Sequence, residues 1–168
     1  MSCPRLLAMA LAACLCTVPL GALAQTALPP PPLIPYGIPL STDDAKRVAA
    51  AAIAEARRNN WNMAIAVVDP GGYLVYFERM PNTQLGSVDL AIEKARTSAL
   101  FRRPTKVFQD ALAGGGDGLR VLRLTGTIPN EGGVPIIVEG KLVGAIGISG
   151  GSVEQDGQAA RSGASSLK

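Results

Sequence analysis

The sequence predicts an α+β fold in which helices flank an antiparallel sheet of about five strands within a single domain. Two observations lead to this prediction. Apolar runs come in pairs joined by short glycine-containing turns, at residues 63–79 and 134–149, which is the pattern of β-hairpins. Helical periodicity lies before, between and after these pairs, so the order is not the strand–helix alternation of a parallel sheet.

The first residues are typical of a secretory signal peptide, which we predict over residues 1–24. An apolar stretch, Leu6–Leu20, follows Arg5, and the last three residues of the signal have the small-x-small form of a cleavage site. The stretch is about fifteen residues long, which is too short for a transmembrane helix. The alternatives are a lipoprotein, because the short sequence ending at Cys14 resembles a lipobox, and an uncleaved segment that stays as an anchor. We therefore expect a periplasmic or secreted protein.

Histidine is absent from the chain, and cleavage after residue 24 would remove every cysteine. Mechanisms that need a Ser-His or Cys-His pair are therefore excluded. The sequence Gly147-Ile148-Ser149-Gly150-Gly151 matches the hydrolase motif G-x-S-x-G, but that motif also needs a histidine base, so only a Ser–Lys variant remains open.

A net charge of +3 and 4% aromatic residues give no basic, aromatic-rich stripe, and we expect no nucleic-acid partner.

The predicted elements begin after a proline-rich linker, residues 25–40, and belong to a domain spanning residues 41–168. Ser41 or Thr42 caps a first helix that ends at Arg58. The first hairpin joins strands 63–69 and 73–79 through a Pro-Gly-Gly turn. A loop over 80–85 follows it.

The second half starts with a helix capped by Ser87 and running over 88–101, and Pro104 opens a shorter helix that ends at residue 112. Residues 121–124 and 127–128 are either short edge strands or irregular. The second hairpin joins strands 134–139 and 142–149 through Gly140-Lys141, and a last helix begins at Val153 and ends near Gly163.

Lys94 and Asp156 are the candidate catalytic residues. Lys94 lies on the apolar face of its helix, where desolvation would lower its pKa and make it a base or an anion ligand. The alternative is an ordinary lysine that pairs with a nearby carboxylate. Asp156 lies in the first turn of the last helix. Together with Arg79 and the helix start at Gly150-Gly151 as anion-binding groups, they would suit an isomerase or lyase that moves a proton beside a carboxylate.

Sulfur and oxygen side chains are candidate ligands for haem iron. Met80, in a loop, is the stronger sulfur candidate, whereas Met63 is expected in the core. Tyr36, Tyr73 and Tyr76 offer phenolic oxygen.

Three blocks of sequence together resemble a known family: the hairpin at 67–75, the segment 79–99, and the segment 132–156 with its GGVPI and GKLVGAIGISGG runs. They are similar to the GlcG/HbpS family of small haem-binding and haem-degrading proteins, and to the C-terminal domain of PduO-type proteins. The resemblance covers about residues 38–166. It implies an antiparallel sheet flanked by helices, assembly into oligomers that are often octamers, and haem binding, iron release or redox sensing beside a two-component kinase.

The haem ligands that the resemblance implies are only partly present in this chain. PduO-like members use a histidine on haem, which this chain lacks. HbpS-like members are linked to a threonine near the haem, and the counterparts to consider are Thr97, Thr105, Thr125 and Thr127.

The leading hypothesis is therefore an exported haem-binding protein, haem-degrading or redox-sensing, that holds haem in an apolar pocket between protomers. The haem propionates would lie near Arg79, Lys94 or Arg103, and Met80, a tyrosine or a threonine would ligate the iron; the helix start at Gly150-Gly151 completes the predicted cofactor-binding set. The alternatives are the isomerase or lyase described above and a non-enzymatic homo-oligomeric sensor or partner of an envelope protein. Convergence of Arg79, Lys94, Glu131 and Asp156 in one pocket would favour the enzyme.

Overall fold

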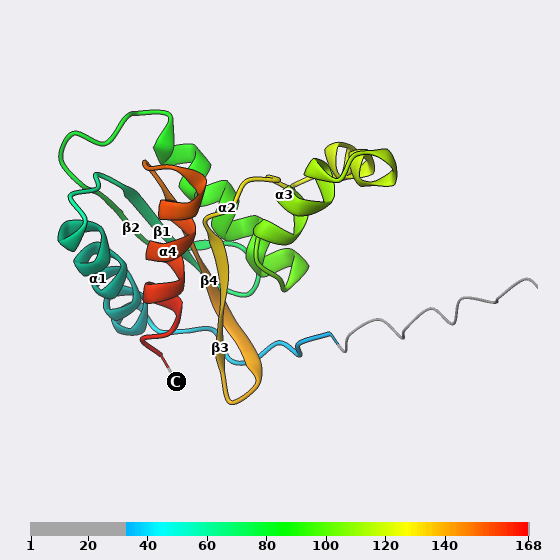
Figure 1. The fold of residues 1–168 in the computed structure, drawn as a ribbon. Helices are drawn as coiled ribbons and strands as arrows, with labels where there is room; N and C mark the ends of the chain where they lie inside the picture. Colours follow the sequence, from blue (N-terminus) through cyan, green and yellow to red (C-terminus); the bar gives the residue numbers. More distant parts are fainter. Residues whose placement is uncertain (1–32, 168) are drawn as a thin grey trace, which may run out of the picture. The chain divides into compact units, whose positions relative to one another are not determined.

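Four antiparallel strands, in the order β2-β1-β4-β3, form the central sheet of this computed structural model, which describes residues 33–167 (Figure 1). The strands are β1 (Ala64–Val68), β2 (Leu74–Arg79), β3 (Gly133–Val138) and β4 (Lys141–Ser149). The hairpins β1–β2 and β3–β4 join through antiparallel pairing of β1 with β4. The predicted signal peptide, the cysteines and the alternative lipidation at Cys14 lie outside the described residues.

The antiparallel sheet flanked by helices is confirmed, but the strand count of about five is wrong. The sheet has four strands because residues 116–123 form a 3₁₀ helix, η1 (Gly116–Arg123), and residues 127–128 form no strand. Glycines with positive φ at 115 and 116 turn the chain into η1 and away from the sheet. Tyr36 makes a single bridge to Leu142 beside β4, without becoming a strand.

Helices cover both faces of the sheet. Helices α1 (Thr42–Arg58) and α4 (Val153–Ala164) pack against each other and on one face, while α2 (Ser87–Phe101) packs on the other face, against β4 and β1 (Figure 1). Helix α3 (Lys106–Ala113) follows α2 and contacts η1. Within residues 33–167, no helix is both long and apolar enough to cross a bilayer.

Strand β1 is buried on both faces, which explains its unbroken apolar sequence. Ile65 and Val67 belong to the larger core under α1 and α4, whereas Ala64, Ala66 and Val68 belong to a second core under α2. The second core is built mainly from alanines, so α2 lies very close to the sheet.

Glycine is required where α2 crosses β4. A Cβ added at Gly147 would lie 2.0 Å from the backbone oxygen of Ala91 and 2.4 Å from the backbone nitrogen of Ala95. The small residues on both elements therefore set the depth to which α2 packs.

Two local predictions differ from the structure. Ser87 is the first residue of α2 rather than its cap; its hydroxyl is buried and accepts a hydrogen bond from the Gln84 amide. The turn of the second hairpin is Glu139-Gly140, both with positive φ, and Lys141 already pairs with Val138. Two consecutive left-handed residues match the right-handed twist of the strands. By contrast, Ser41 caps α1 as expected, in a capping box with Asp44.

The segment before α1 lies along the first half of β4. We call residues 34–40 the N-terminal strap. Leu142 donates its backbone N–H to the Pro35 oxygen at 2.8 Å, and Gly37 and Leu40 donate to the Leu142 and Val143 oxygens at 2.7 Å and 2.9 Å. Leu40 is buried in the core. Three backbone hydrogen bonds and one buried side chain thus attach the strap to the sheet.

Candidate functional site

A buried ion pair joins the two helical layers. Lys94, from α2, donates from Nζ to Asp156 Oδ2 at 2.7 Å and to the Ile148 carbonyl oxygen at 3.1 Å. Lys94 is 0% and Asp156 3% exposed. Gly132, just before β3, makes room for the ammonium group, because a Cβ at that position would lie 2.9 Å from Nζ and 3.0 Å from the Asp156 Cβ. The sequence predicted both residues for one site without showing that they touch, and the structure places them in direct contact.

Burial opposes the charge on both members of the pair. Desolvation lowers the pKa of Lys94, and the negative charge of Asp156 partly restores it. Desolvation likewise raises the pKa of Asp156, against the effects of Lys94 and of the backbone N–H groups of Gly151 and Gly150. The Gly151 N–H donates to Asp156 Oδ1 at 3.0 Å. The helix start that the sequence suggested for a ligand anion therefore already holds a carboxylate of the protein.

A second pair lies beside the first. Glu131 is 5% exposed and accepts a hydrogen bond from Arg161 Nη1 at 2.6 Å. The Glu131 backbone N–H donates to Gln109 Oε1 at 2.8 Å. Gly157 of α4 permits this contact, because a Cβ there would lie 2.1 Å from Glu131 Oε1. Lys94, Glu131, Asp156 and Arg161 form a set that we call the charge cluster.

A small cavity borders the charge cluster. It has a volume of about 280 Å³, and Glu131 and Arg161 line it together with Lys106, Asp110 and a few apolar residues. Lys106 is itself paired with Asp110 at 2.7 Å. Each cation in the wall thus has a carboxylate partner inside the chain, which weakens its attraction for an external anion.

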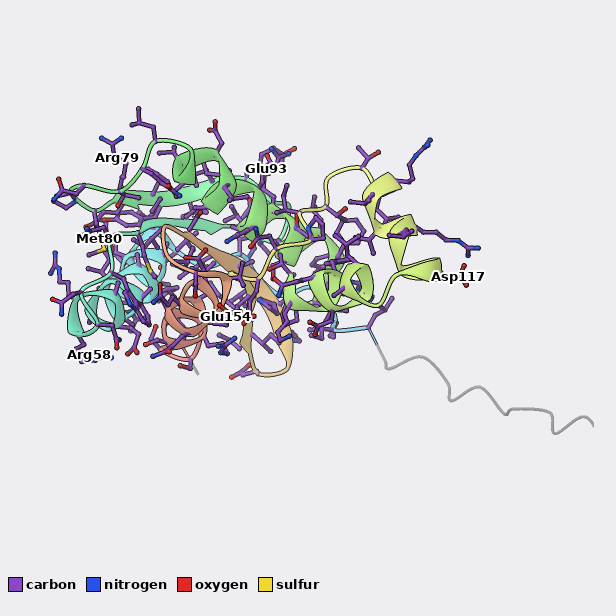
Figure 2. The ribbon with its side chains drawn as sticks, turned by 45° about the horizontal axis from the view of Figure 1, so that its top comes forward. Arg58, Arg79, Met80, Glu93, Asp117 and Glu154 are labelled. Carbon is purple, nitrogen blue, oxygen red and sulfur yellow. The ribbon has the colours of Figure 1, made fainter. Side chains whose placement is uncertain are left out.

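The other predicted site residues do not join the charge cluster. Arg79 is exposed at the end of the edge strand β2, and Figure 2 shows Arg79 and Met80 together at that end. Met80 is 6% exposed and packs in the larger core. Arg103 is exposed, with its guanidinium 5.9 Å from the centre of the Phe108 ring. Of the four residues whose convergence would favour an enzyme, Arg79 is therefore the one that stays apart.

Most candidate iron ligands already have structural roles. Met63 is 0% exposed. Thr97 Oγ1 donates to the Gly126 oxygen and accepts from the Ile128 N–H, and Thr105 bonds to the backbone of Gly133. Thr127 donates to backbone oxygens, whereas Thr125 is exposed. Across residues 33–167, no group of three or more acidic, histidine or cysteine side chains is placed to hold a metal ion.

The three candidate tyrosines differ in their exposure and in their contacts. Tyr76 donates its hydroxyl to Glu78 Oε2 at 2.8 Å. Tyr73 is 75% exposed in the turn of the first hairpin. Tyr36 is 51% exposed and lines a cavity of about 590 Å³ between the N-terminal strap and the β3–β4 hairpin. We call this space the strap cavity. Sequence reasoning missed it, because it forms between segments about a hundred residues apart.

The chain is similar to known proteins over almost the whole α+β domain. The sequence model of the family of haem-degrading HbpS-like proteins matches residues 40–165. Protein GlcG of Escherichia coli K12 is 39% identical over 110 residues, which is 66% of this chain and 81% of GlcG. The corrinoid adenosyltransferase PduO of Salmonella typhimurium is 32% identical over 121 residues, which is 71% of this chain but only 36% of PduO.

Solved structures agree with the sequence matches. The crystal structure of HbpS superposes with a TM-score of 0.72 at 29% identity, covering 79% of this chain and 93% of HbpS. The crystal structure of a PduOC complex with haem superposes with a TM-score of 0.70 at 30% identity, covering 78% of this chain and 96% of PduOC. Both similarities extend over nearly the whole of the compared proteins.

Proposed function

This chain belongs to the HbpS-like family of haem-degrading proteins, and on that basis we propose that it binds haem. The observation that carries the proposal is the similarity to the PduOC–haem complex over 96% of that protein. The whole family match lies in the described part of the chain, so the comparison concerns the same α+β domain that holds the charge cluster and the strap cavity.

The side chains available fit haem with an oxygen ligand rather than a histidine ligand. The chain has no histidine, and both methionines discussed above are buried in the core. Exposed phenol and hydroxyl groups remain, and tyrosine is an established haem ligand. Bound haem would supply iron redox chemistry, so haem breakdown by peroxide or redox sensing would need no protein base. The residues of this chain would bind the porphyrin, orient it and pair with its propionates.

A haem titration of the purified protein tests this proposal. We expect a saturable change in Soret absorbance with an end point at a fixed haem-to-protein ratio, and affinity in the micromolar range or tighter. An unrelated protein with comparable exposed apolar surface serves as the control for non-specific uptake. A response no larger than that of the control would contradict the proposal.

We propose export as part of the same function, with residues 1–24 as the signal peptide and a periplasmic or secreted product. Mass spectrometry of protein recovered from the envelope and the medium tests this. A mature chain beginning at Gln25 supports cleavage, a lipid-modified Cys14 supports the lipoprotein alternative, and an intact N-terminus on cytoplasmic protein contradicts both.

We also propose that the chain forms a homo-oligomer, in line with the family resemblance, which would suit a sensor that contacts an envelope partner. Large apolar side chains support it: Val107 on α3 and Leu119 and Leu122 on η1 are 46%, 53% and 63% exposed. Light scattering coupled to size-exclusion chromatography measures the mass directly. A monomer at micromolar concentration would contradict this proposal.

One observation favours the isomerase or lyase as a second candidate. Glu131 both lines the 280 Å³ cavity and contributes its charge to the environment of Lys94, so a small carboxylate bound there would lie beside the charge cluster. Lys94 itself is 0% exposed, so the predicted role of Lys94 and Asp156 as bases requires the cluster to open. Screening carboxylic acids for proton exchange with solvent, with Asp156→Asn as the comparison, tests this candidate.

A further inference from the structure

We propose that Tyr36 is the iron ligand and that haem binds in the strap cavity, against the N-terminal strap and the β3–β4 hairpin. This inference rests on the proposed function, because it assigns a site to the haem proposed there.

Donor atoms are few in the part of the chain that the structure describes. Met63 and Met80 are buried, and Tyr76 is committed to Glu78. Tyr73 is exposed in a turn and lines neither the 280 Å³ cavity nor the strap cavity. Tyr36 combines an exposed phenol ring with a position in a cavity wall.

Size separates the strap cavity from the others. Its volume of about 590 Å³ lies well inside the range of about 300–1,000 Å³ that is usual for ligand pockets, whereas four further cavities on the described residues have volumes between about 250 and 360 Å³. Its walls are mainly apolar: Ile38 and Pro39 come from the strap, and Val138 and Val143 from the hairpin. Ile38 is 87% exposed, so a flat apolar ligand would cover a side chain that now faces water.

The position of Tyr36 is fixed from both sides. The strap hydrogen bonds to β4 on either side of this residue, from Pro35 and Gly37. Gly37 allows the close approach, because a Cβ there would lie 3.0 Å from the Lys141 Cβ. On the other side, Arg102 places its guanidinium 4.9 Å from the centre of the Tyr36 ring and donates to the Ile34 oxygen at 3.1 Å. A ligand held this way needs little ordering when it binds iron.

The charges near Tyr36 favour a ligand with carboxylates. Lys141 lies in the wall of the strap cavity, and Arg102 covers the ring of Tyr36, so two cations flank the phenol. Glu139 also lies in the wall and opposes them with one negative charge. Haem carries two propionates, which match the two cations. Figure 1 lets the reader follow the strap, drawn in blue, past the β3–β4 hairpin.

Haem titrations of the purified protein and of Tyr36 variants test the assignment. We expect Tyr36→Phe to weaken haem binding by at least about tenfold and to remove the phenolate-to-iron charge-transfer band and the phenolate modes in the resonance Raman spectrum. Tyr36→His should restore binding with a histidine-type spectrum, which a merely structural role of the ring would not produce. Lys141→Ala should weaken binding while leaving the phenolate spectrum intact.

Matched controls make the result decisive. Tyr73→Phe makes the same change at an exposed tyrosine outside the cavity, and we expect wild-type affinity and spectrum. A variant with Cys3, Cys14 and Cys16 all replaced by serine should also keep the wild-type spectrum. If wild-type protein binds haem and Tyr36→Phe keeps its spectrum, or if the cysteine variant loses it, the assignment to Tyr36 is overturned while the proposed function stands. If wild-type protein binds no haem, the proposed function fails first.

Discussion

Replacing Lys94 by methionine should destabilise the protein strongly, because it leaves the buried Asp156 carboxyl without its partner. Methionine matches the length of the lysine stem, so the packing of α2 changes little. The substitution removes the hydrogen bonds from Nζ to Asp156 and to the Ile148 oxygen. What remains is a carboxylate that is 3% exposed and still accepts the Gly151 N–H.

The size of the effect follows from the geometry of the pair. At a separation of 2.7 Å and an effective dielectric constant of about 20, the attraction between the two charges is about 6 kcal/mol before desolvation is counted. Desolvation of each ion offsets much of that attraction, but removal of one partner leaves the penalty of the other in place. We expect Lys94→Met to lower the free energy of unfolding by about 3–5 kcal/mol. That is a large part of the about 5–15 kcal/mol typical of a domain.

Urea unfolding followed by circular dichroism measures the effect, with Lys46→Met as the matched control. Lys46 lies on α1 with its side chain 58% exposed and 3.7 Å from Asp43, so its replacement should change stability by less than about 0.5 kcal/mol. The double variant Lys94→Met/Asp156→Asn should be more stable than Lys94→Met alone, because no unpaired charge remains. A loss below about 1 kcal/mol for Lys94→Met, or a double variant less stable than both single variants, would show that the buried ion pair does not stabilise the fold in this way.

Three further predictions concern the scaffold. Gly147→Val should cost stability at or above the upper end of the about 1–3 kcal/mol usual for overpacking, because the new side chain meets the Ala91 backbone rather than a flexible side chain; thermal unfolding would show it, and an unchanged midpoint would contradict the packing. Ser152→Ala should lower the free energy of unfolding by about 1 kcal/mol, because it removes the N-cap of α4. Urea unfolding measures this, and a change near zero would contradict the role of the cap. The Arg47 hydrogen bond lowers the pKa of Asp44, so Asp44 contributes stability that is present above its usual pKa of 3.8 and lost as the pH falls through its folded value. Asp44→Asn should therefore be less stable than wild type at pH 7 and equal to it in strong acid, and a pH-independent difference would exclude this linkage.

Local sequence patterns were sufficient for most of the secondary structure. The capping residue Ser41 and the alanine-rich periodicity after it placed α1 correctly, and the paired apolar runs placed both hairpins. The local signal was weak around Val121, for which an edge strand and irregular structure both stayed open; the residue lies in a 3₁₀ helix, after glycines whose positive φ turns the chain.

The candidate site was predicted only in part. Lys94 was identified as a lysine on an apolar face, and Asp156 as an acid at a helix start, because each position is unusual within its own element. Arg79 was predicted as an anion-binding residue and Met80, in a loop, as a haem ligand; the structure leaves Arg79 exposed and places Met80 in the core. Arg161, the partner of Glu131, could not be identified from the sequence, because a cation on an exposed helix turn is ordinary.

Local sequence was enough to place the α-helices and both hairpins, because periodicity, caps and turn residues act over a few neighbouring positions. The fold as a whole is needed to bring Lys94 to Asp156, 62 positions away, and to place Tyr36 between Arg102 and the β3–β4 hairpin. These contacts depend on how deeply α2 packs on an alanine and glycine surface and on how the strap pairs with β4. These contacts arise from the packing of whole helices and strands, and no short stretch of sequence determines that packing.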